Sequence, residues 1–195
     1  MDPSLEPLLD DLYRSGREHD ASKEDRLERL RNVEPETARL LSVLIRATGA
    51  RRILEIGTSN GYSTMWLAEA ARATGGGVVS VEVEAARSED ARRNLERAGL
   101  AGLVELRVED AADTLAVAED DAYDLVFLDA ERPAYASYWP ELVRVLRPGG
   151  LLVVDNVISH ADQVAAFRAL VAADERVSEA DAPTGAGALL VVMTP

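Results

Sequence analysis

The sequence predicts an α/β fold in which a mostly parallel sheet of seven strands is covered by helices on both faces. Two observations predict it. From Arg51 onward, short apolar runs alternate with helical stretches, a pattern typical of parallel sheets. The runs Leu125–Leu128 and Leu151–Val154 are continuously apolar, as burial on both faces requires. A chain of 195 residues is long enough for one domain with a full core.

The first 50 residues predict helices and no strand. Leu5–Leu12 and Leu27–Val33 carry apolar residues at helical spacing. Pro35 is well placed in a first helical turn, and the apolar face that follows ends near Gly49. We therefore expect a helical cap over residues 1–50 and a core over 51–195, together one domain over 1–195. The cap is expected to pack on the core or to cover its ligand.

The remaining elements follow in order. The expected strands are Arg52–Ile56, Val78–Val83, Leu103–Val108, Tyr123–Asp129, Leu151–Asp155, Val177–Ala180 and Ala188–Val192. Between them we expect helices over Tyr62–Ala73, up to Arg97, over Ala112–Ala118, up to Arg147–Gly150 and over Asp162–Ala173. Ligands of such sheets bind beyond the carboxyl ends of the strands, where the strand order reverses.

Composition limits the possible functions. The net charge of −14 repels phosphate backbones, so nucleic acid is an unexpected partner. No apolar run approaches the roughly 20 residues of a membrane span, and the N-terminus lacks the pattern of a signal peptide. Cysteine is absent, which excludes disulfides and thiolate metal sites. We expect a cytoplasmic protein that does not enter a membrane.

The segment Glu55–Thr64 joins the first strand to a helix and predicts a ligand-binding loop. Gly57 allows a tight turn, Gly61 allows close approach of a ligand, and Ser63 with the free helix amides can hold an anionic group. The second glycine of a dinucleotide-binding loop is replaced by Ser59, which disfavours a dehydrogenase. Glu82 ends the second strand and can accept hydrogen bonds from ribose hydroxyls.

Three oxygen-bearing side chains predict a metal site. Asp129 ends the fourth strand, and Asp155 and Asn156 end the fifth. A single Asp at a strand end is explained by capping a turn, but three such side chains at matching ends favour a cation. Two carboxylates and an amide fit Mg²⁺ or another divalent cation such as Ca²⁺ or Mn²⁺.

These segments resemble the S-adenosylmethionine-dependent O-methyltransferases related to catechol and caffeoyl-CoA O-methyltransferases. The resemblance rests on Ile53–Thr64, Asp124–Ala130 and Leu146–Asn156, and runs from about Pro35 to Arg176. It implies a Rossmann-like methyltransferase fold, a homodimer, and a divalent metal on Asp129, Asp155 and Asn156 that binds substrate hydroxyls. The implied cofactor-binding residues are Glu55, Gly57, Ser59, Gly61, Tyr62, Ser63, Glu82, Asp110, Ala111 and Asp129.

One position departs from the family. The family has a lysine, taken as the general base, three residues after the first metal aspartate, and here Arg132 stands there. Arginine keeps its proton at any working pH. Arg132 is then expected to stabilise an oxyanion, while the metal bound by Asp129 acidifies the substrate hydroxyl. Otherwise a neighbouring group takes the proton (Glu131, Tyr135 or His160), or the protein is a weak catalyst.

Three functions remain open. The first is a metal-dependent O-methyltransferase of a small hydroxylated substrate, which is expected to be catechol-like. The second is a methyltransferase acting on hydroxyuridine in tRNA, which a basic cluster at the mouth of the site would favour. The third is a cofactor-binding module with weak or no turnover.

Overall fold

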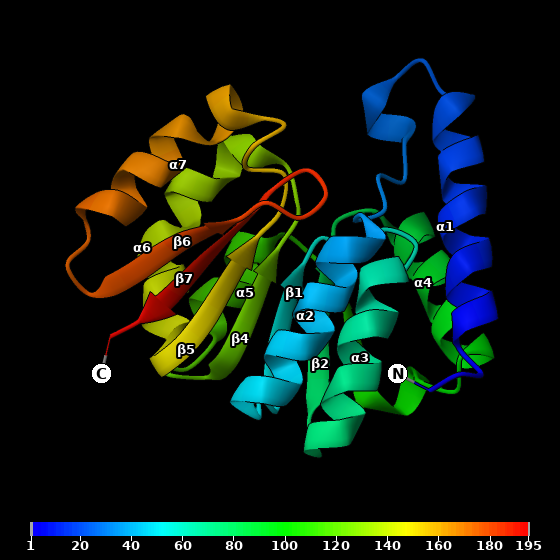
Figure 1. The fold of residues 1–195 in the computed structure, drawn as a ribbon, viewed down its shortest axis with the longest axis horizontal. Coiled ribbons are helices and arrows are strands. Elements are labelled where there is room, and N and C mark those ends of the chain that lie inside the picture. The colour runs from blue at the N-terminus through cyan, green and yellow to red at the C-terminus, as the bar shows by residue number, and fades with distance from the viewer. Residues whose placement is uncertain (1, 195) are drawn as a thin grey trace.

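The computed structural model describes residues 2–194, so the two terminal residues of the expected domain lie outside it. Seven strands form one sheet in the order β3-β2-β1-β4-β5-β7-β6. β7 is antiparallel to both of its neighbours, and the pairs among β1 to β5 are parallel. This confirms the expected mostly parallel sheet of seven strands (Figure 1). The strands are β1 (Arg52–Ile56), β2 (Gly77–Glu82), β3 (Val104–Val108), β4 (Tyr123–Leu128), β5 (Leu146–Val154), β6 (Val177–Ala182) and β7 (Ala188–Met193).

Helices cover both faces of the sheet. The α-helices are α1 (Glu6–Ala21), α2 (Pro35–Thr48), α3 (Tyr62–Thr74), α4 (Ala85–Arg97), α5 (Ala111–Val117), α6 (Tyr135–Val145) and α7 (Ala161–Ala173). Short 3-10 turns are η1 (Arg26–Glu28), η2 (Ala101–Leu103) and η3 (Arg132–Ala134). None of the helices over residues 2–194 is long and apolar enough to cross a bilayer.

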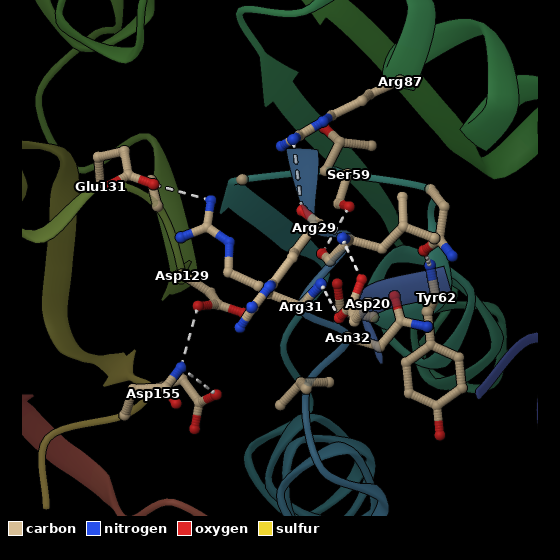
Figure 2. Close-up of a pocket in the computed structure, with 18 of the residues that line it drawn as sticks. Asp20, Arg29, Arg31, Asn32, Ser59, Tyr62, Arg87, Asp129, Glu131 and Asp155 are labelled. Carbon is tan, nitrogen blue, oxygen red and sulfur yellow. Dashed lines mark hydrogen bonds and ion pairs between the residues drawn. The ribbon is translucent and has the colours of Figure 1, made fainter. Parts of the chain in front are cut away.

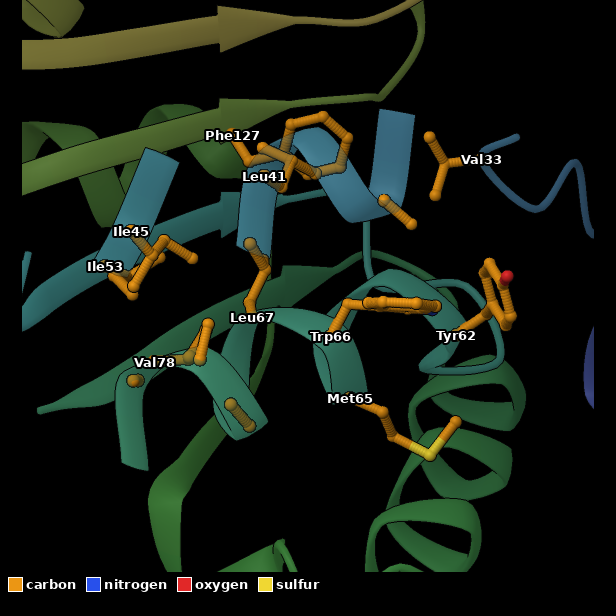
Figure 3. Packing of buried hydrophobic residues seen from close by; sticks show 14 of the residues in the cluster. Val33, Leu41, Ile45, Ile53, Tyr62, Met65, Trp66, Leu67, Val78 and Phe127 are labelled. Carbon is orange, nitrogen blue, oxygen red and sulfur yellow. The ribbon is translucent and has the colours of Figure 1, made fainter. Parts of the chain in front are cut away.

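Alternate residues of each central strand enter two separate cores. Ile53 of β1 packs with α1, α2 and α3, whereas its neighbour Leu54 packs with α5, α6 and α7. This follows from the two-residue period of a strand. Figure 3 shows the first core, in which Leu41 and Ile45 of α2 lie among residues of α3 and the sheet. The N-terminal helices are thus integral to one of the two cores.

The order of the strands reverses at β1, which lies between β2 and β4. β1 pairs with β2 on one side and with β4 on the other, and Ile56 is in register with both Val81 and Leu128. The loops after these strands therefore diverge to opposite faces and leave a crevice between them.

The helix expected over Leu27–Val33 was wrong. Residues 22–34, which we call the strap, contain only the 3-10 turn η1 and are otherwise irregular. The helix α2 begins at Pro35 and ends at Thr48, with Gly49 as its C-cap, as expected. Side chains from outside the strap form hydrogen bonds with its backbone. Asp20 accepts from the amides of Leu30 and Arg31, at 2.6 and 2.9 Å. Pro35 also favours an extended conformation for the residue before it. Together with the bonds to Asp20, this outweighs the weak helical tendency of residues 27–33.

One strand boundary also differs from the expectation. α6 ends at Val145, and β5 begins at Leu146 rather than at Leu151. Tyr123 of β4 pairs with Leu146, whereas Leu125 already pairs with Leu151, so an irregularity in β5 accommodates Pro148 and the glycines after it. The site end of β5 is unaffected.

Candidate functional site

A pocket of about 670 Å³ lies at the carboxyl ends of β1, β2, β4 and β5. Its floor is the loop after β1, and its walls include Glu82, Asp129 and Asp155. The strap and the end of α1 cover it from the other side (Figure 2). Residues distant in the sequence thus line one cavity. It lies beyond the carboxyl ends of the strands, where the sequence predicts a ligand site.

The loop after β1 is shaped by close contact with β4. Gly57 has φ of 108°, and a Cβ atom there would lie 2.0 Å from the carbonyl oxygen of Asp129. Only glycine fits this position. The loop therefore lies directly against the end of β4, with Ser59, Tyr62 and Ser63 lining the pocket.

Glu82 and Ser59 connect the predicted ribose site to the strap. The Ser59 amide donates to Glu82 Oε2 at 2.8 Å, and the Glu84 amide donates to Oε1 at 3.1 Å. Each carboxylate oxygen can accept a further bond from a ribose hydroxyl. The Ser59 hydroxyl donates to the carbonyl of Leu30 at 2.8 Å, which holds the strap over the loop.

Glu55 lies beneath the loop rather than in the pocket lining. It is fully buried, and Oε2 accepts from the hydroxyls of Thr64 and Ser80, at 2.5 and 2.6 Å. Its Oε1 atom has no hydrogen-bond partner among the described residues. Burial raises the pKa of Glu55 to about 7. Glu55 therefore supports the loop from below, in a strongly desolvated position.

Three other predicted cofactor residues also lie outside the lining. A Cβ atom at Gly61 would lie 3.0 Å from Ala91, so this glycine allows α3 and α4 to pack closely instead of admitting a ligand. Asp110 caps α5 by accepting from the amide of Ala112 at 2.8 Å. Ala111 is buried in the second core. The adenine contact assigned to Asp110 and Ala111 stays a prediction.

The three predicted metal ligands come together. Asp129 and Asp155 follow register partners of β4 and β5. The Asn156 side-chain amide donates to Asp155 Oδ2 at 2.9 Å and to Asp129 Oδ1 at 3.4 Å. Asn156 has φ of 64°, a conformation that asparagine tolerates better than most residues. The sequence prediction that these side chains are adjacent is therefore confirmed.

The chemistry of this cluster fits a divalent cation. Asp155 is buried and Asp129 is partly buried, and desolvation raises the pKa of both carboxyls. Asp155 Oδ1 has no hydrogen-bond partner among residues 2–194. No three His, Cys, Asp or Glu side chains of that range gather as a metal site. A cation would therefore depend on these two carboxylates, the Asn156 amide, water and substrate.

Arg132 is buried beside the carboxylates. It is 5% exposed, and its Nε and Nη1 atoms have no hydrogen-bond partner in the described part of the chain. Its charge lowers the pKa of Asp129 against the larger effect of burial. Arg132 therefore brings a permanent positive charge, with free donors, to the side of the pocket that carries Asp129.

The other candidate bases differ in their surroundings. The Tyr135 hydroxyl is enclosed, donating to the carbonyl of Ala130 and accepting from its amide, and burial raises its pKa. Burial would raise the pKa of Glu131, but Arg31 and Arg26 lower it overall. His160 lines the pocket, and burial and nearby arginines lower its pKa, which keeps the imidazole neutral. Of the three, His160 is the best suited to accept a proton.

Sequence reasoning missed the residues that the strap and α1 contribute to the pocket. Their spacing suggested a helix, and no motif marks them. The polar ones are Tyr13, Arg17, Asp20, Arg26, Arg29, Arg31, Asn32 and Glu34, and α4 adds Arg87.

Comparison with protein families identifies the family of this chain. The model of an O-methyltransferase family matches residues 7–193. The chain belongs to this family. The resemblance found in the three sequence segments is thereby confirmed. Among relatives of this family, the catechol O-methyltransferase of Mycobacterium tuberculosis is 42% identical over 147 residues, 71% of this chain and 66% of that protein. The chain thus spans slightly less than two thirds of that relative's length.

Solved O-methyltransferases share the fold over nearly the whole chain. The enzyme from Bacillus cereus, solved in complex with SAH, is 30% identical with a TM-score of 0.79, covering 97% of this chain and 91% of that one. TomG from Streptomyces achromogenes, solved in complex with SAM, is 32% identical with a TM-score of 0.80, covering 96% and 89%.

Proposed function

We propose that this protein transfers the methyl group of S-adenosylmethionine (SAM) to a hydroxyl of a small, catechol-like substrate in a reaction that needs a divalent cation. The observation that carries the proposal is that one pocket joins the Gly57–Ser63 loop and Glu82 to the adjacent carboxylates Asp129 and Asp155. Family membership and the relatives solved with SAM or SAH support the cofactor.

The reaction requires alignment more than covalent chemistry by the protein. A bond forms between the substrate oxygen and the methyl carbon as the carbon–sulfur bond breaks. Sulfur keeps the electron pair of the broken bond, and the hydroxyl proton leaves. Holding the two reactants in line supplies much of the acceleration. The Gly57–Ser63 loop and Glu82 would hold the cofactor, and the strap would exclude water from above.

Asp129, Asp155 and Asn156 would hold the cation, which supplies acidification of the bound hydroxyl. Arg132 would stabilise the negative oxygen, because its unpartnered donors lie beside these carboxylates. It cannot accept the proton. His160, with its neutral imidazole, would accept the proton directly or through water.

Calorimetry with SAM and methyl-transfer assays on catechols, with and without Mg²⁺, test the proposal. We expect SAM binding and Mg²⁺-dependent transfer. Asp155→Ala should abolish the Mg²⁺ dependence and most of the transfer, whereas Asp162→Ala, at an exposed position of α7, should change neither. Failure to bind SAM would refute the proposal. SAM binding without transfer to any hydroxylated substrate would indicate a cofactor-binding module.

A second candidate is methylation of hydroxyuridine in tRNA. The arginines at the mouth of the pocket favour it, and the net charge of −14 disfavours it. Transfer to tRNA in the same assay would decide between the two substrates.

A further inference from the structure

Arginines and carboxylates line the pocket together, and three of the arginines lie near the predicted cation site. Arg26 and Arg31 of the strap and the buried Arg132 approach the predicted cation site. Arg26 and Arg31 both pair with one carboxylate, Glu131, at 3.0 and 2.7 Å. Two guanidinium groups therefore share a single carboxylate.

Hydrogen bonds to Asp20 hold Arg31 in an unfavourable backbone conformation. Its backbone has φ of 53°, a conformation that costs on the order of 1 kcal/mol or more for a residue with a side chain. Asp20 offsets this cost by accepting from the amides of Leu30 and Arg31. Figure 2 shows Asp20 and Arg31 on the strap side of the pocket, with Glu131 and Asp129 opposite. Backbone strain held at a pocket points to a task for the side chain.

Arg29 of the strap and Arg87 of α4 serve a different purpose. Arg29 donates to the carbonyl of Lys23, and Arg87 donates to the carbonyls of Leu27 and Arg29. These bonds fix the course of the strap. Among the described residues, the guanidinium groups of Arg26 and Arg31 pair only with Glu131, which is itself half exposed, so they can turn to a ligand.

Resting on the proposed function, we propose that the substrate is a catechol that also carries a carboxylate, and that Arg31, with Arg26, binds this second anionic group. The two hydroxyls would lie at the cation, and the carboxylate would reach toward the strap. Guanidinium groups bind carboxylates with paired, charge-assisted hydrogen bonds. A neutral catechol would leave the guanidinium groups of Arg26 and Arg31 to share Glu131, with no second anionic partner from the substrate.

Three catechols of similar size test this: 3,4-dihydroxybenzoate, its neutral methyl ester and the cationic 3,4-dihydroxybenzylamine. We expect the acid to have a KM about tenfold below that of the ester, because hydrogen bonds to charged groups are worth about one power of ten. The amine should be the poorest substrate. The preference should shrink as salt is raised. Arg31→Gln combined with Arg26→Gln should abolish the preference.

Arg14→Gln is the matched control. Arg14 is an exposed arginine of α1, paired with Asp11 and outside the pocket lining, so its loss removes one charge without touching the site. It should preserve the preference. Urea unfolding of each variant separates a folding defect from a binding defect.

A binding measurement keeps the test independent of turnover. Calorimetry with SAH and Mg²⁺ present should show tighter binding of the acid than of the ester in the parent and equal binding in the double variant. Equal binding or equal KM values in the parent would overturn this inference while leaving the proposed function intact. Weaker SAM binding by the double variant with an unchanged acid preference would assign the arginines to the cofactor and overturn it too. Transfer to tRNA but to none of the catechols would overturn both proposals.

Discussion

Replacing Glu55 by glutamine should remove a pH dependence of stability that this buried carboxyl imposes. Burial raises its pKa from an ordinary value of 4.5 to about 7. The folded state therefore binds a proton more tightly than the unfolded state. Its stabilising contribution is complete below about pH 4.5 and is lost as the pH rises to about 7. At about 1.4 kcal/mol per pKa unit, the loss is about 3 kcal/mol, of which about 2 kcal/mol falls between pH 5 and 7.5.

Urea unfolding at pH 5.0 and 7.5 measures this effect. The lower limit stays above the isoelectric point of about 4.6, where the protein would tend to precipitate. Glutamine is uncharged at both pH values, so the stability of Glu55→Gln relative to the parent should rise by about 2 kcal/mol between them. Glu96→Gln, at an exposed position of α4, should show no such rise. An equal pH dependence in the parent and Glu55→Gln would refute the reasoning.

Three further predictions concern the loop, the strap and the proton. Gly57→Ala should destabilise the protein by at least about 3 kcal/mol and abolish SAM binding, because its Cβ would meet the Asp129 carbonyl oxygen at 2.0 Å. Gly49→Ala, also at positive φ but with no atom within 4 Å, should cost about 1 kcal/mol in the same urea unfolding, and equal losses would contradict the steric argument. Asp20→Ala should cost about 1–3 kcal/mol in urea unfolding and raise the substrate KM, since it frees two strap amides; an unchanged KM would show that the strap does not position substrate. Arg132→Lys should raise kcat at pH 8 by about tenfold or more if proton removal limits transfer, and an unchanged kcat would show that it does not.

The sequence was informative where a single segment carries the physical requirement. Gly57 is predictable because only glycine fits a tight turn against a neighbouring strand. The adjacency of Asp129 and Asp155 is predictable because parallel strands in a sheet end at the same edge. Long apolar runs likewise identified the central strands.

The roles of individual glycines and caps needed the structure. Gly61 is required by the packing of α3 against α4, and Asp110 is occupied in capping α5. A glycine or a capping residue has the same appearance in a sequence whether its neighbour is a ligand or another helix. Contact between distant segments distinguishes the two cases.

By itself, the sequence determined the sheet, the loop after β1 and the paired carboxylates, because each depends on local spacing and on the rule that joins parallel strands. Only the tertiary structure decided the course of the strap and the arginines that it brings to the pocket. The apolar residues of the strap have only weak helical spacing. Its conformation is set by hydrogen bonds to side chains outside the segment, those of Asp20, Ser59 and Arg87. Such long-range hydrogen bonds leave no periodic trace in the sequence, although they set the charge that faces the substrate.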